Sequence, residues 1–123
     1  MGVERLEVGS FRDLDVYQEG YRLAITVHKL TKTFPDQERY EIGSQLRKAA
    51  VSIPANIAEG YGRSEAEFKR FLWIALGSSN EVMVYLDMVN DLGYAQGGAD
   101  LRDSYDILGK RLYRLIQNWK SHF

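Results

Sequence analysis

The fold is decided by residues 45–92, which read QLRKAAVSIPANIAEGYGRSEAEFKRFLWIALGSSNEVMVYLDMVNDL. In the second half of this stretch, residues recur at alternating steps of four and three, which places them on one stripe of an α-helix. The members of this stripe are Phe68, Leu72, Ala75, Ser79, Val82, Leu86 and Val89. Ser64 and Glu67 fit a capping box, and Gly93 supplies a C-terminal stop. We therefore predict a helix over residues 65–92.

The first half of the stretch carries a narrower apolar seam with the same spacing. It is formed by Ile42, Leu46, Ala49, Ile53 and Ile57. Pro54 interrupts this helix because it removes a backbone hydrogen bond and its ring crowds the preceding turn. The seam nevertheless continues in phase after the proline, so we expect a kink and not a break. The predicted helix covers residues 37–61.

Two further amphipathic helices flank this hairpin, over residues 11–33 and 99–121. The last one has a stripe made of Leu101, Tyr105, Leu108, Leu112, Leu115 and Trp119. Short connections between four such helices predict an all-α, antiparallel up-down-up-down four-helix bundle. At 123 residues, the chain is expected to form one domain over 1–123. Residues 1–9 lack a clear period, and we expect them to form a mobile arm.

Polar side chains fall on or near the seam between the two central helices. They are Ser52, Asn56, Glu59, Arg63 and Glu81. The first four are spaced four, three and four apart, so they share one helix face. The favoured interpretation is a structural hydrogen-bond and ion-pair network that fixes the register of the helices. The alternative is a ligand or metal pocket between the helices.

This central stretch resembles the bacterial four-helix-bundle family called 23S rRNA-intervening sequence proteins. The most specific part is SIPANIAEG, from Ser52 to Gly60, and its spacing to GSSNE, from Gly77 to Glu81, supports the resemblance. The family is similar in fold to the accessory protein of diversity-generating retroelements, which forms a five-fold barrel and binds nucleic acid and a reverse transcriptase. The resemblance covers essentially the whole chain and implies a homo-oligomeric ring, a homopentamer, without established catalysis.

Composition excludes several classes of protein. The formal net charge of −1 argues against nucleic-acid binding by bulk positive charge, although it permits a local basic face. The absence of cysteine excludes disulfides and thiolate chemistry. No segment has the length and apolarity of a signal peptide or a membrane span, so we expect a cytoplasmic protein that does not enter membranes.

Catalytic and metal-binding patterns are missing from the sequence. A di-iron bundle needs Glu-x-x-His pairs, and neither His28 nor His122 has a glutamate three residues before it. The sequence also lacks a phosphate-binding loop and the HExxH and GxSxG motifs. We therefore predict no enzyme activity, no metal and no cofactor.

Positive charge gathers in the last helix. From Ile107 onward the chain has four basic residues and no acid. Complementarity to the helix dipole is the structural explanation. The functional alternative is a strip that contacts phosphates, which other helices would extend if they faced the same way. The candidate nucleic-acid-binding residues are Arg47, Lys48, Lys110, Arg111, Arg114 and Lys120.

Together, these observations and the resemblance predict a non-catalytic, oligomeric helical scaffold that associates with RNA or with another nucleic-acid-associated protein. The alternative is a protein–protein interaction module with no nucleic-acid role. Aromatic residues that lie off the main stripes favour this alternative, because aromatics are enriched at protein interfaces. They are Tyr61, Trp73, Tyr85 and Tyr113.

Overall fold

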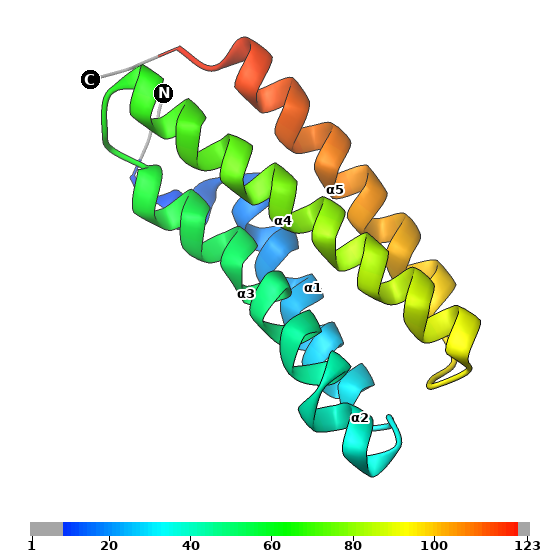
Figure 1. Ribbon diagram of the computed structural model, residues 1–123. Helices are drawn as coiled ribbons and strands as arrows, with labels where there is room; N and C mark the ends of the chain where they lie inside the picture. Colours follow the sequence, from blue (N-terminus) through cyan, green and yellow to red (C-terminus); the bar gives the residue numbers. More distant parts are fainter. Residues whose placement is uncertain (1–8, 121–123) are drawn as a thin grey trace.

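The computed structural model describes residues 9–120 and consists of helices joined by short connections (Figure 1). The elements are the 3-10 helix η2 (Phe11–Asp13) and the α-helices α1 (Asp15–Thr31), α2 (Asp36–Tyr40), α3 (Ile42–Gly60), α4 (Glu65–Leu92) and α5 (Gly98–Asn118). No strand occurs within residues 9–120, so the prediction of an all-α bundle is confirmed for this part of the chain. The mobile arm predicted for residues 1–9 lies, except for Gly9, outside the described residues.

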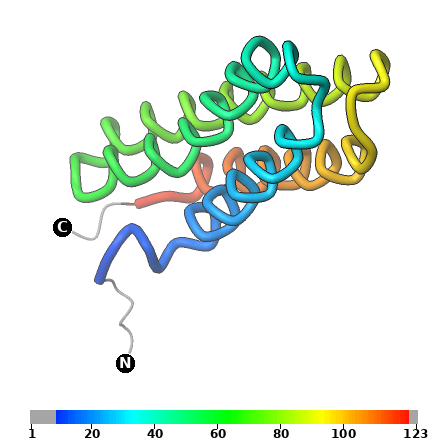
Figure 2. Tube along the Cα trace, turned by 90° about the horizontal axis from the view of Figure 1, so that it is seen from below, coloured from blue at the N-terminus to red at the C-terminus, as the bar shows by residue number. Residues whose placement is uncertain are grey.

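The four long helices form two layers, with α3 and α4 in one layer and α1 and α5 in the other (Figure 2). Each long helix packs against two others, because α3 contacts α1 and α4 while α5 contacts α4 and α1. Along α3 and α4 the contacts run in opposite order: Ser52 meets Ser78, and Gly60 meets Phe71. The chain therefore turns back on itself at the α3–α4 connection, as Figure 1 also shows.

The core is one continuous cluster formed by residues from all four long helices. Each helix contributes its apolar stripe, so burial follows the helical period read from the sequence. Fully buried side chains include Val27 of α1, Ile53 of α3, Leu86 of α4 and Tyr105 of α5. This arrangement leaves the opposite side of each helix available to solvent, and the charged residues lie there.

The observed bounds of α4 are those predicted, because local signals set them. The Ser64 hydroxyl accepts a hydrogen bond from the Glu67 backbone N–H at 3.2 Å. Gly93 ends the helix in the left-handed region, with φ of 71°. At the other end of the chain, α5 begins at Gly98 and ends at Asn118, close to the expected 99–121.

Two predicted helices need correction. The segment predicted as one helix over 37–61 is divided into α2 and α3 at Glu41, whose φ of −101° and ψ of −89° lie outside the helical region. The break leaves the Arg39 carbonyl without an intrahelical donor, and Arg47 Nη2 donates to it at 3.2 Å. The predicted helix over 11–33 instead begins as η2, capped by Ser10, and α1 starts only at Asp15.

α1 packs closely against the turn of α3 that contains the proline. Pro54 lies inside α3, which remains helical to Gly60. A Cβ atom at Gly20 of α1 would lie 3.5 Å from Pro54 Cδ and 3.1 Å from Ile53 Cγ2. The glycine therefore lets α1 approach the proline-bearing turn without a side chain between them.

Candidate nucleic-acid interface

The basic run of the sequence lies on the outer side of α5. This helix buries one stripe against α1 and α4, which includes Leu108 and Leu112. Lys110, Arg111 and Arg114 project from the remaining surface and are exposed. Lys120 follows the helix and is exposed as well. We refer to these four side chains, Lys110, Arg111, Arg114 and Lys120, as the α5 basic strip.

The cations of this strip differ in how they are neutralised. Lys110 Nζ lies 3.2 Å from Asp106 Oδ2, one helical turn away, and both side chains are largely open to solvent. Such a surface pair contributes little and is easily exchanged for another anion. Arg111 and Arg114 make no ion pair within residues 9–120. Two guanidinium groups are thus available for an external anion.

Grooves run along both sides of α5, and the basic strip borders each of them. The groove between α4 and α5 has Leu76 and Gly109 at its base, with Lys110, Tyr113 and Arg114 among its lining residues. A Cβ atom at Gly109 would lie 3.4 Å from Leu76 Cδ1, so a larger side chain at this position would fill part of the groove. The groove on the α1 side is lined by several residues, among them Asp13, Asp15, Arg111, Arg114 and Asn118. Arg114 therefore borders both.

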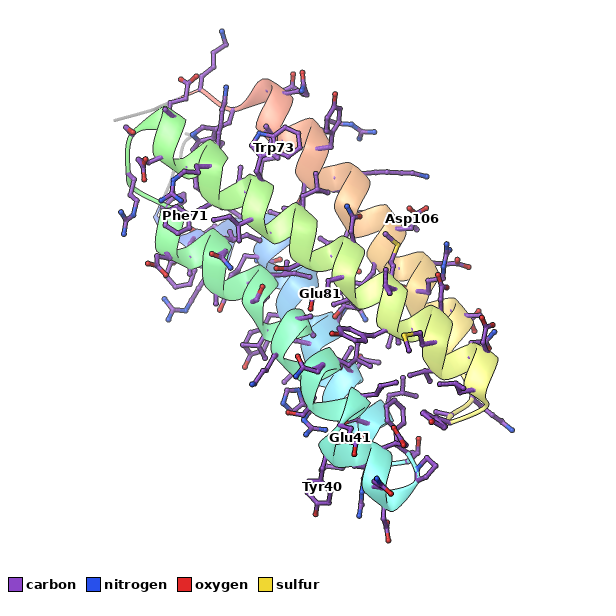
Figure 3. The ribbon with its side chains drawn as sticks, viewed as in Figure 1. Tyr40, Glu41, Phe71, Trp73, Glu81 and Asp106 are labelled. Carbon is purple, nitrogen blue, oxygen red and sulfur yellow. The ribbon has the colours of Figure 1, made fainter. Side chains whose placement is uncertain are left out.

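An exposed aromatic pair lies beside the basic strip. Trp73 of α4 and Tyr113 of α5 have ring centroids 6.0 Å apart and an interplanar angle of 70°. They are 48% and 50% exposed, respectively. Figure 3 shows Trp73 projecting from α4 toward α5. Both rings were identified from the sequence as aromatics off the main stripes, but only the fold reveals that they meet.

The structure does not bring Arg47 and Lys48 to the α5 strip. Both lie on α3, which packs against α1 and α4. The Arg47 guanidinium donates to Thr31 Oγ1 at 2.9 Å and to the Arg39 carbonyl at 3.2 Å. Arg47 thus connects α1, α2 and α3. The prediction that Arg47 and Lys48 extend the α5 basic strip needs correction. Lys48 is exposed beside His28 and Val51 in a separate shallow groove.

The predicted polar network is divided into smaller pieces. The Ser52 and Ser78 hydroxyls form a short hydrogen bond between α3 and α4, and Asn56 Nδ2 donates to the Ser52 carbonyl at 2.7 Å. Arg63 and Glu59 form an ion pair at the exposed end of α3, at 4.0 Å between Nη2 and Oε2, and the Arg63 guanidinium also lies 5.0 Å from the centroid of the Phe71 ring.

Glu81 takes no part in this network. It is exposed on α4 and has no hydrogen bond or ion pair to any residue between 9 and 120 (Figure 3). The polar contact between α3 and α4 therefore lies at Ser52, with Asn56 beside it, and farther along α3 the contact is between Gly60 and the apolar Phe71.

The sequence did not reveal two hydrogen bonds that involve buried side chains, those of Thr31 and Ser79. Thr31 is 1% exposed and is held by Arg47. Ser79 is fully buried and donates to the Tyr105 carbonyl at 3.0 Å, which explains the polar member of the α4 stripe. The Tyr105 hydroxyl is buried without a hydrogen-bond partner, and burial, aided by the negative charge of Glu19, raises the pKa of this phenol.

Metal ligands and membrane spans were also sought in the described structure. Within residues 9–120, no three histidine, aspartate or glutamate side chains gather as metal ligands would. None of the helices in that range has the combination of length and apolarity needed to cross a bilayer.

Comparison with known proteins agrees with the sequence resemblance. The profile of the 23S rRNA-intervening sequence proteins matches residues 12–114 of the chain. The chain belongs to this family. The chain is also similar to the crystal structure of a protein of unknown function from the S23 ribosomal protein family of Bacteroides thetaiotaomicron. That likeness has a TM-score of 0.77 and 24% sequence identity, covers 84% of this chain and 96% of the other, and establishes a common fold. No curated protein matches.

The segment that is most specific to the resemblance contributes to the packing of this protein. In SIPANIAEG, Ile53 and Ile57 fill the core, and Ser52 bonds across to α4. Gly60 ends the segment where a Cβ atom would lie only 2.6 Å from Phe71 Cβ. Packing and helix register thus account for these residues, so the segment gives no indication of a reaction.

Proposed function

We propose that this protein is a non-catalytic, homo-oligomeric helical scaffold that associates with RNA through phosphate contacts. The α5 basic strip carries this proposal. Arg111 and Arg114 are exposed without an ion pair in the described chain, and they border grooves on both sides of one helix. Side chains that contact phosphates position a nucleic acid without reading its sequence.

A near-neutral protein can still bind a polyanion through such a surface. The net charge of −1 is unevenly distributed, because the chain from Ile107 onward holds four basic residues and no acidic residue. Guanidinium groups are suited to phosphate because their planar N–H donors match two phosphate oxygens. The local field of the strip, and not the overall charge, is the feature that would attract RNA.

Charge reversal on the strip tests the proposal. The variant that combines Arg111→Glu and Arg114→Glu should bind a structured RNA hairpin at least tenfold more weakly at low salt, measured by fluorescence anisotropy. The matched control combines Arg22→Glu and Lys29→Glu on α1 and changes the net charge equally. Equal loss in both variants would point to bulk charge, and unchanged binding in the first would refute the assignment of the strip.

We propose that self-association uses the outer surface of α4, with the five-fold ring of related proteins as the expected assembly. Val84, Met88 and Leu92 follow one another at steps of four on this surface and are 57%, 41% and 53% exposed. The opposite side of α4 already fills the core. A helix with a second apolar stripe commonly has a second partner.

Light scattering can test this assembly. Val84→Glu should convert the oligomer to a monomer, because a buried unpaired carboxylate at an interface is costly. Ile107→Glu, at an equally exposed apolar position of α5, should leave the mass unchanged. A monomeric wild type at micromolar concentration would contradict the ring.

The second candidate function is a protein-interaction module without a nucleic-acid role. The specific observation that favours it is the same exposed apolar surface of α4, which another protein could cover as well as a second copy. If the wild type binds no RNA at low salt while Val84→Glu releases a copurifying protein, this candidate replaces the first.

A further inference from the structure

We propose that the groove between α4 and α5 holds an unpaired nucleotide of single-stranded RNA, with its phosphates on Arg114 and Lys110. Its base would stack on Tyr113, which lines the groove, and on the adjoining ring of Trp73. This inference rests on the proposed RNA association. It adds a preference that phosphate contacts alone do not create: the site would favour exposed bases over a fully paired helix.

The aromatic pair has the exposure that stacking requires. Each ring is about half open to solvent, although both belong to helices whose other sides are buried in the core. Their edge-to-face contact, with centroids 6.0 Å apart, fixes the two rings relative to each other. A base can therefore cover an aromatic face that is already oriented, and bases of any sequence can do so because each has a π-face.

Cations lie next to the rings on the same helix. Arg114 follows Tyr113 directly, Lys110 precedes Tyr113 by one turn, and all three line the same groove. Arg114 makes no ion pair within residues 9–120, and Lys110 pairs with Asp106, which lines the same groove and has a side chain that is 45% exposed. Phosphates that flank a stacked base would meet these cations, which is the combination that single-strand binding surfaces use.

The size and boundaries of the groove suit one nucleotide better than a helix. Its volume is about 540 Å³, within the usual range for small-ligand sites. Asn80 and Gln117 supply amide groups along the edges, which can donate to and accept from a base. Toward the C-terminal end of α4, Arg102 Nε and Asp87 Oδ1 lie 2.7 Å apart and connect α5 to α4 across the surface. This ion pair lies beyond the groove's lining, which comes from residues 76–83 of α4 and 106–117 of α5.

The experiment separates base stacking from phosphate binding. Anisotropy would compare a short uridine oligonucleotide with an abasic oligomer of the same length and phosphate count, on the oligomeric full chain. The uridine oligomer should bind at least fivefold more tightly than the abasic one. It should also quench tryptophan fluorescence, which the abasic oligomer should not do.

Variants assign the effect to the aromatic pair. Tyr113→Ala and Trp73→Ala should each remove most of the difference between the two oligomers, and Trp73→Phe should retain it because a stacking ring remains. Tyr40→Ala is the matched control, since Tyr40 is 75% exposed on α2 and distant from the groove. The aromatic substitutions should leave hairpin binding through Arg111 unchanged.

Each outcome has a clear meaning. If both oligomers bind equally and charge reversal of the strip weakens both, RNA association stands and stacking is refuted. If neither oligomer nor the hairpin binds at low salt, the proposed function fails together with this site. If RNA does not bind and Tyr113→Ala lowers the mass measured by light scattering, the groove is a protein contact and the inference is overturned.

Discussion

Replacing Gly60 with alanine should destabilise the bundle, because this residue of α3 packs directly against Phe71 of α4. The added Cβ would lie 2.6 Å from Phe71 Cβ, 2.9 Å from Cγ and 3.0 Å from Cδ2. Carbon atoms prefer separations of about 3.5–4.0 Å, so the first overlap is about 1 Å. Phe71 is 7% exposed, and its Cβ is fixed to the α4 backbone, so rotation of the ring cannot relieve the contact.

The expected magnitude follows from two opposing effects. Overpacking a buried site costs about 1–3 kcal/mol, and this site belongs at the upper end because the clash is with a fixed atom. Alanine recovers at most about 1 kcal/mol of helix propensity over glycine, and less at the last residue of a helix. We expect the free energy of unfolding to fall by about 2 kcal/mol.

Urea unfolding followed by circular dichroism can measure this change. With a slope near 2 kcal/mol per molar, the midpoint for Gly60→Ala should fall by about 1 M. Gly77→Ala is the matched control, because Gly77 is inside α4 with no atom within 4 Å of its added Cβ. At the same protein concentration, its midpoint should rise by roughly 0.5 M. A Gly60→Ala midpoint at or above that of the wild type would refute the packing argument.

Three further predictions concern buried polar groups. Tyr105→Phe should leave stability unchanged or raise it by up to about 1 kcal/mol in urea unfolding, because the hydroxyl it removes is buried without a partner. The pKa of Tyr105 in the folded protein lies above its ordinary 10.0. With respect to the ionisation of this residue, the free energy of unfolding therefore keeps its full value below pH 10 and falls above it. The midpoint temperature of thermal unfolding should therefore fall more steeply above pH 10 in the wild type than in Tyr105→Phe. Parallel falls in the two proteins would contradict the raised pKa of Tyr105. Arg47→Met should cost about 2 kcal/mol in urea unfolding by leaving Thr31 and the Arg39 carbonyl without its donors, whereas Lys48→Met should be neutral.

The parts of the fold that the sequence predicts well are those set by local signals. The bounds of α4 follow from Ser64 and Gly93, which lie next to the helix ends, whereas the Glu67 side chain of the predicted capping box pairs with Arg70. The break at Glu41 has a weaker local signal, since no proline occurs there and the nearest glycine, Gly43, lies two residues later inside α3. At this break Arg47 reaches back from α3 to the Arg39 carbonyl of α2, a contact that the helical period does not predict.

The candidate site shows the same division. Periodicity places Lys110, Arg111 and Arg114 outside the buried stripe of α5, and the structure has them exposed. Whether Lys48 joins them depends on which helices are neighbours, and the helical period contains no information on that. The contact between Trp73 and Tyr113 likewise depends on the register of α4 against α5. Spacing identifies which residues share a face of one helix but not what that face meets.

The salt dependence of RNA binding tests the central claim most directly. Anisotropy titrations of the wild type with a structured RNA hairpin, repeated over a series of salt concentrations, give the slope of the logarithm of the association constant against that of salt. Neutralising several phosphates with the four cations of the α5 basic strip predicts a slope of about −3. The account predicts this steep decline and a shallower slope, by roughly 1.4 to 1.8, for Arg111→Glu with Arg114→Glu. Absence of binding at low salt, or a flat slope in the wild type, would contradict it.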